Sequence, residues 1–109
     1  MKNTITAQMI SECYDEFRKG NKEHIPEGMN KNSAKMTMVW LDCLFEDKDI
    51  HWNGSIMQCK LVLELIEKDY DEKKLTKAKS VLKKYCESAL KKYNRPCTSL
   101  RRLLSGTAL

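Results

Sequence analysis

The chain has 109 residues, of which 41% are apolar, and a formal net charge of +5. A chain of this length is expected to form a single domain over residues 1–109, with one small core. Polar residues interrupt its two most apolar segments, 36–45 and 56–66, so neither has the length of a membrane span. We therefore expect no stable membrane insertion.

The charge is distributed unevenly along the chain. Residues 1–70 contain 9 Lys and Arg against 12 Asp and Glu, whereas residues 71–109 contain 11 against 3. Such asymmetry can indicate an anionic partner. A simpler interpretation is that these lysines form the solvated face of one amphipathic helix. We favour that interpretation and expect no nucleic-acid partner.

Apolar residues recur at helical spacing throughout, and no segment alternates in the manner of a strand. A first helix is predicted over residues 4–19, and residues 21–32 have no period and are predicted to form a loop. Ser33 is expected to cap a second helix that runs to about Glu46. This second segment is apolar around most of its circumference, which predicts a central position.

Capping signals mark two further helix starts. Ser55 and Gln58 fit a capping box, in which the hydroxyl accepts a backbone hydrogen bond and the Gln side chain returns one, and predict a third helix from residue 56. Thr98 is expected to cap a short last helix over residues 99–104, which Ser105 and Gly106 would close.

A fourth helix is predicted from just after Asp71 to about Asn94. Its lysines are expected to point outward, and Tyr85 and Tyr93 are expected on the inward stripe. Exposed aromatic residues among lysines would favour nucleic-acid binding, so an inward position of the two tyrosines argues against it.

The five cysteines allow two broad interpretations, a disulfide framework in a secreted chain or reduced thiols in an intracellular one. The nearest two cysteines are 11 positions apart, and no pair has the short spacing of a zinc site, so no metal site is expected. No motif joins a cysteine to either histidine, so we expect neither enzymatic activity nor a cofactor.

The positions of Cys13, Cys43, Cys86 and Cys97 resemble the frame of insect odorant-binding proteins of the pheromone-binding type, as that family's first, third, fourth and fifth cysteines. Residues 40–47 are also similar to the family's passage around its third cysteine. The resemblance extends over nearly the whole chain.

Two cysteines of the family frame are absent, because Val39 and Gly106 occupy their positions. The chain therefore looks like a reduced-cysteine branch, or a salivary or haemolymph relative. In the family the first cysteine pairs with the third, which implies a disulfide between Cys13 and Cys43. The pairing of the other three remains open: Cys59, Cys86 and Cys97.

The resemblance implies an all-α, compact single domain of five or six helices, with disulfide-linked helices around an apolar cavity. Its implied function is that of a secreted carrier for a small apolar ligand such as an odorant, a pheromone or a fatty acid. Trp52 lies in a polar turn, so we expect its side chain to face solvent and its fluorescence to report the solvent. The residues expected to bind the ligand are Met9, Met36, Trp40, Leu44, Met57, Leu61, Leu65, Leu82 and Tyr85.

An alternative function is that of an intracellular helical interaction module, which would bind nucleic acid or an acidic protein through its basic fourth helix. Residues 1–4 do not read as a signal peptide, so a secreted form is expected to be the mature protein with an added initiator Met. The sequence leaves open the ligand, glycosylation of Asn53 and the oligomeric state, for which a weak homodimer is one option.

Overall fold

The computed structural model describes residues 5–50 and 52–105, and this part of the chain is all-helical, as predicted. None of its helices combines the length and the apolar character that crossing a membrane requires. The helices are α1 (Ala7–Arg18), α2 (Lys31–Glu46), α3 (Ile56–Asp69), α4 (Glu72–Tyr93) and α5 (Thr98–Leu104).

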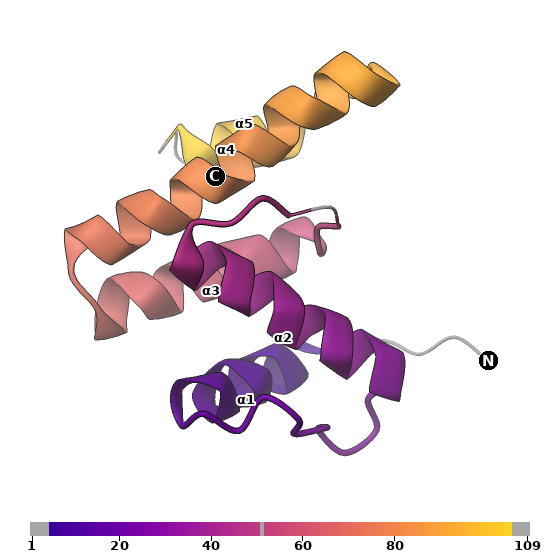
Figure 1. Cartoon of the computed structure of the whole chain (residues 1–109), viewed down its shortest axis with the longest axis vertical. Helices are drawn as coiled ribbons and strands as arrows, with labels where there is room; N and C mark the ends of the chain where they lie inside the picture. Colours follow the sequence, from indigo (N-terminus) through magenta and orange to yellow (C-terminus); the bar gives the residue numbers. More distant parts are fainter. Residues whose placement is uncertain (1–4, 51, 106–109) are drawn as a thin grey trace.

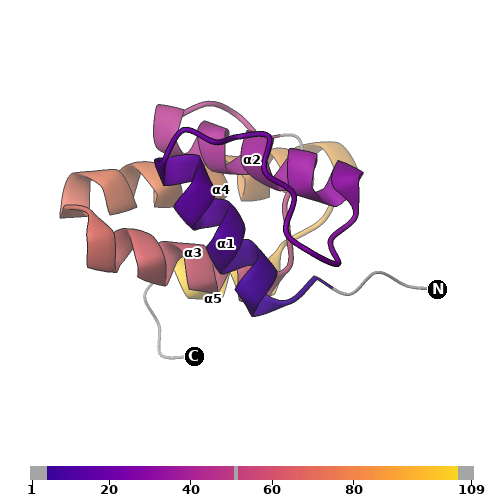
Figure 2. The same cartoon turned by 90° about the horizontal axis from the view of Figure 1, so that it is seen from below.

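Four of the helices form a closed arrangement in which each packs against two others. Helix α1 contacts α2 and α3, and α4 contacts the same two helices from the other side. Helices α3 and α4 run side by side in opposite directions, and the short α5 folds back against both of them (Figures 1 and 2).

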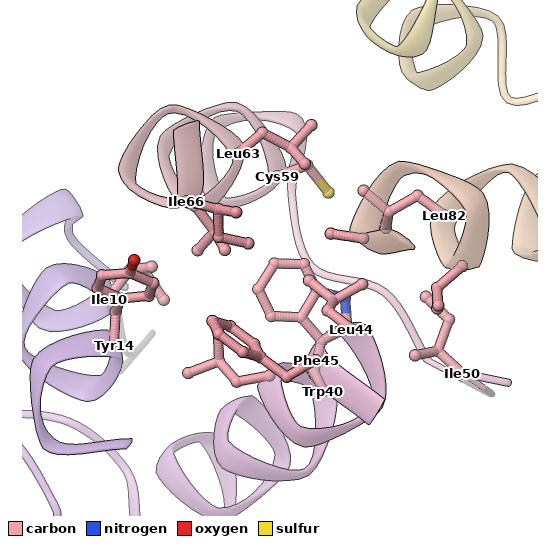
Figure 3. Packing of buried hydrophobic residues seen from close by; sticks show 14 of the residues in the cluster. Ile10, Tyr14, Trp40, Leu44, Phe45, Ile50, Cys59, Leu63, Ile66 and Leu82 are labelled. Atoms are coloured by element: carbon pink, nitrogen blue, oxygen red, sulfur yellow. The ribbon is translucent and has the colours of Figure 1, made fainter. Parts of the chain in front are cut away.

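A single hydrophobic cluster joins the helices. Trp40 and Leu44 of α2 point toward Ile66 of α3 and Leu82 of α4 (Figure 3), and all four side chains are at most 1% exposed. Phe45 turns toward α1, where its ring lies 5.0 Å from that of Phe17 between centroids. Helix α2 therefore contributes to the core on two sides, toward α1 and toward α3 and α4.

The capping box predicted at the start of α3 is confirmed. The Ser55 hydroxyl accepts from the Gln58 backbone N–H at 3.2 Å, and the Gln58 side chain accepts from the Ser55 backbone N–H at 3.2 Å. The predicted cap of α2 is wrong, because the helix begins two residues before Ser33. Asn30 caps it instead, with Oδ1 accepting from the Asn32 N–H at 2.8 Å.

The turn between α4 and α5 also differs from the prediction. Thr98 is the first residue of α5 and not its cap, a position that Cys97 occupies without a side-chain hydrogen bond. Both Asn94 and Cys97 have positive φ, 54° and 48°, which lets the chain reverse around Pro96. The proposed closing residue, Gly106, lies outside the described residues.

The structure does not form the expected Cys13–Cys43 bridge, because all five cysteines are free thiols. Phe45 marks the side of α2 that faces α1, and Cys43, two residues earlier, lies about 200° around the helix from it. Cys13 is fully buried, and its thiol donates to the Met29 sulfur at 3.9 Å. The two thiols therefore lie on different sides of α2.

Candidate functional site

An apolar pocket of about 310 Å³ lies between α2 and the segment that leads to α3. Ligand pockets in proteins typically have volumes of about 300–1,000 Å³ and mostly apolar walls, so this one is large enough for a small molecule only. Its lining residues are Lys35, Met36, Val39, Trp40, Cys43, Asp49, Ile50 and Trp52.

The indole of Trp40 contributes to the inner wall of the pocket and is held in place by a hydrogen bond. Its Nε1 donates to Asn53 Oδ1 at 2.8 Å, and the side chain is 1% exposed. The same oxygen accepts from the Cys59 thiol at 3.4 Å. Asn53 thus joins α2 to α3 through these two hydrogen bonds.

The outer wall consists of apolar side chains that α2 leaves open to solvent. Met36 is 42% exposed and Val39 is 58% exposed. We predicted a central position for α2 because it is apolar around most of its circumference. This prediction is wrong for the side that carries Met36 and Val39, since no helix of the described part of the chain covers that side. Lys35 and Asp49 place one charge of each sign in the same lining.

The nine residues predicted to bind a ligand do not surround one cavity in the structure. Met36 and Trp40 line the pocket, whereas Leu44 and Leu82 are buried in the core. Met57 is 41% exposed on α3, outside this pocket. The remaining four are partly buried and pack against the core: Met9, Leu61, Leu65 and Tyr85.

Sequence reasoning missed part of the lining. The expectation that Trp52 faces solvent is wrong, because this side chain is half-buried and forms part of the pocket with Ile50. Met36, Val39 and Cys43 recur at steps of three and four, a spacing that could have identified them as one stripe of α2. No feature of the local sequence predicts that the segment between α2 and α3 packs near that stripe.

The outer face of α4 is a second candidate site. Apart from Lys84, whose Nζ lies 3.9 Å from Asp47 Oδ1, the strongly exposed lysines of this helix form no ion pair within the described residues. Those lysines are Lys73, Lys77, Lys83, Lys91 and Lys92.

The prediction that Tyr93 points into the core is wrong. Its side chain is 71% exposed, and the neighbouring Leu90 is 43% exposed. Tyr93 lies on the same side of the helix as the buried stripe, but the last turn of α4 extends beyond the core (Figure 1). An exposed aromatic ring therefore lies in the same last turn of α4 as Lys91 and Lys92.

Burial makes several of the thiols poor nucleophiles. It raises the pKa of Cys59 and of Cys86 to about 11, and burial together with the charge of Glu12 does the same for Cys13. Thiols with such values are almost fully protonated near neutral pH, and the thiolate is the reactive form. Within residues 5–50 and 52–105, no three His, Cys, Asp or Glu side chains are grouped closely enough to hold a metal ion.

Comparison with known proteins found no matching family model, no matching curated protein and no matching solved structure.

Proposed function

We propose that the protein is a secreted carrier that binds a small apolar ligand in the pocket bounded by Met36, Val39, Trp40 and Trp52. The observation that supports this function is the apolar lining of that pocket, about 310 Å³ in volume, on an otherwise charged molecule. The resemblance of the cysteine frame to odorant-binding proteins supports secretion.

The size of the pocket limits the ligand. At about 30 Å³ for each water-sized group, 310 Å³ accommodates roughly ten non-hydrogen atoms. Each methylene that leaves water contributes about 0.8 kcal/mol, which corresponds to roughly a fourfold gain in affinity. A short aliphatic or monocyclic molecule fits these limits, whereas a long-chain fatty acid would extend into solvent.

A chain-length series tests the proposal. A naphthylamine dye whose emission rises in apolar surroundings would be bound first and then displaced by primary alkanols of increasing length. We expect affinity to rise about fourfold per added carbon and to level off at roughly ten non-hydrogen atoms. A dye that does not bind, or an affinity that grows without levelling, would contradict the proposal.

Two methionines provide a matched pair of variants. Met36 and Met57 are 42% and 41% exposed, yet only Met36 lines the pocket. Met36→Ala should weaken alkanol binding about fivefold, through the loss of about 1 kcal/mol of apolar contact, and Met57→Ala should leave it unchanged. An equal effect of both variants would place the binding site elsewhere.

The exposed position of Tyr93 favours a second candidate function, binding of single-stranded nucleic acid by the C-terminal end of α4. A base can stack on an exposed aromatic ring while Lys91, Lys92 and Arg95 neutralise phosphates. Arg95 is exposed, and its side chain forms no ion pair within the described residues.

Fluorescence anisotropy of a labelled single-stranded oligonucleotide tests this second function. Binding should weaken steeply with salt, and Lys91→Glu with Lys92→Glu should abolish it. Lys60→Glu with Lys68→Glu makes the same charge change on exposed positions of α3 and should retain most of the affinity. Equal losses in the two double variants would mean that net charge alone drives binding.

A further inference from the structure

The outward side of α2 carries apolar side chains that remain open to solvent. Val39, which is 58% exposed, forms a ridge between two hollows, because it lines both the apolar pocket and a second groove of about 540 Å³. Met36 borders the apolar pocket, and Ile25, 43% exposed, borders the second groove. Three of the large exposed apolar side chains of the molecule therefore gather along one edge.

The charges on this side of α2 are separated by sign along the helix. Lys31 and Lys35 lie in its first two turns, and Asp42 and Glu46 lie in its last two. Helical geometry places the four within about 60° of one another around the axis. Asp42 is paired with Lys22 at 2.9 Å, whereas the other three are exposed and form no ion pair within residues 5–50 and 52–105.

This order of charges does not stabilise α2 itself. The positive end of a helix dipole favours acidic residues and the negative end favours basic ones, yet the first turn of α2 has no acidic residue and its last turn no basic one. Lys31 and Lys35 are also four residues apart, as are Asp42 and Glu46, and like charges at this spacing repel each other on one helix. The reason for the arrangement therefore lies outside the helix.

A second copy of α2, lying antiparallel to the first, would turn both effects into attraction. The midpoint of the two charge pairs falls between residues 38 and 39. Lys31 and Glu46 each lie about 11 Å from this point along the axis, in opposite directions, and Lys35 and Asp42 each lie about 5 Å from it. A two-fold axis through the midpoint therefore brings Lys31 of each copy opposite Glu46 of the other, with Val39 beside the axis.

We propose that two copies of this chain associate through the outward side of α2, in antiparallel orientation, with Val39 at the centre and Lys31 opposite Glu46. The second copy would also cover the open outer wall of the apolar pocket, which Met36 and Val39 form. The association requires no ligand, so it can fail or succeed independently of the carrier function.

The size of this surface limits the affinity. Helix α2 has 16 residues, so its outward side is about 24 Å long and about 10 Å wide, which is smaller than the roughly 800 Å² per partner of a standard interface. A weak dimer is therefore expected, with a dissociation constant of roughly 100 µM. Sedimentation equilibrium of the full chain from about 10 µM to about 1 mM measures it. A mass that stays monomeric over this range would overturn the proposal.

Two exposed apolar residues provide matched variants for the centre of the contact. Val39→Lys would place two positive charges beside the two-fold axis and should weaken association at least about tenfold. Met57→Lys adds the same charge at a position of α3 that is 41% exposed, and it should leave association unchanged. Equal effects of the two variants would show that the dimer uses another surface.

Charge reversal tests the antiparallel orientation. Lys31→Glu and Glu46→Lys each place like charges opposite one another twice, so each should weaken association about tenfold. The variant that carries both changes restores the opposite charges and should associate like the wild type. Lys60→Glu makes the same charge change at an exposed position of α3 and should not weaken the dimer, because it lowers the net positive charge of both copies. A combined variant as weak as the single ones would refute the pairing of Lys31 with Glu46.

Discussion

Replacement of Trp40 by Phe should destabilise the protein substantially, because Trp40 combines full burial with a hydrogen bond. The substitution removes the bond from Nε1 to Asn53 Oδ1, 2.8 Å long, at a net cost of about 1 kcal/mol. It also removes part of a ring that is 1% exposed, which costs about 1 kcal/mol more in apolar burial. The expected loss is therefore about 2 kcal/mol, or roughly 10 °C in melting temperature.

Trp52→Phe is the matched control, since Trp52 lines the same pocket but is only half-buried and donates no hydrogen bond within the described residues. It should lose less than about 1 kcal/mol. Urea unfolding followed by far-ultraviolet circular dichroism measures both variants. Equal losses for the two tryptophans would refute the assignment of Trp40 as the anchored one.

A double-mutant cycle isolates the hydrogen bond itself. If the indole and Asn53 interact as the distance indicates, Trp40→Phe and Asn53→Ala should show a coupling energy of about 1 kcal/mol. Cys59 also donates to this Asn53 oxygen, so the single Asn53→Ala variant should cost more than the coupling energy alone. Additive effects would show that the bond contributes nothing to stability.

Three further predictions concern local interactions. Ser55→Ala removes half of the capping box of α3 and should lower the free energy of unfolding by about 1 kcal/mol, measured by urea titration. Asn94→Ala should cost about 1 kcal/mol in the same assay and Asn94→Gly should cost nothing, because φ at this position is 54° and only the Ala variant is strained. The hydrogen bond from Lys22 lowers the pKa of Asp42 below its unfolded value. The stabilisation is therefore present above an unfolded pKa of about 4 and is lost as pH falls through the folded pKa, and Asp42→Asn should flatten the loss of stability in acid.

The sequence by itself determined the helical class and those helix starts that depend on neighbours along the chain. The start of α3 is an example, because Ser55 and Gln58 satisfy each other's backbone groups within a single turn. The buried stripe of α4 was equally predictable for Leu82 and Cys86, since helical periodicity places them on one line. At α2, Asn30 and Ser33 are both of residue types that cap helices well. The prediction from sequence was Ser33, whereas Asn30 caps the helix in the structure.

Tertiary structure decided which apolar residues are covered and which remain open. Tyr93 shares the angular position of buried residues but is 71% exposed, because the end of α4 extends beyond the helices that would cover it. Trp52 lies in a polar segment but is half-buried, because that segment folds back over α2. Periodicity fixes the direction in which a side chain points. Only the packing of the other helices decides whether it meets protein or water.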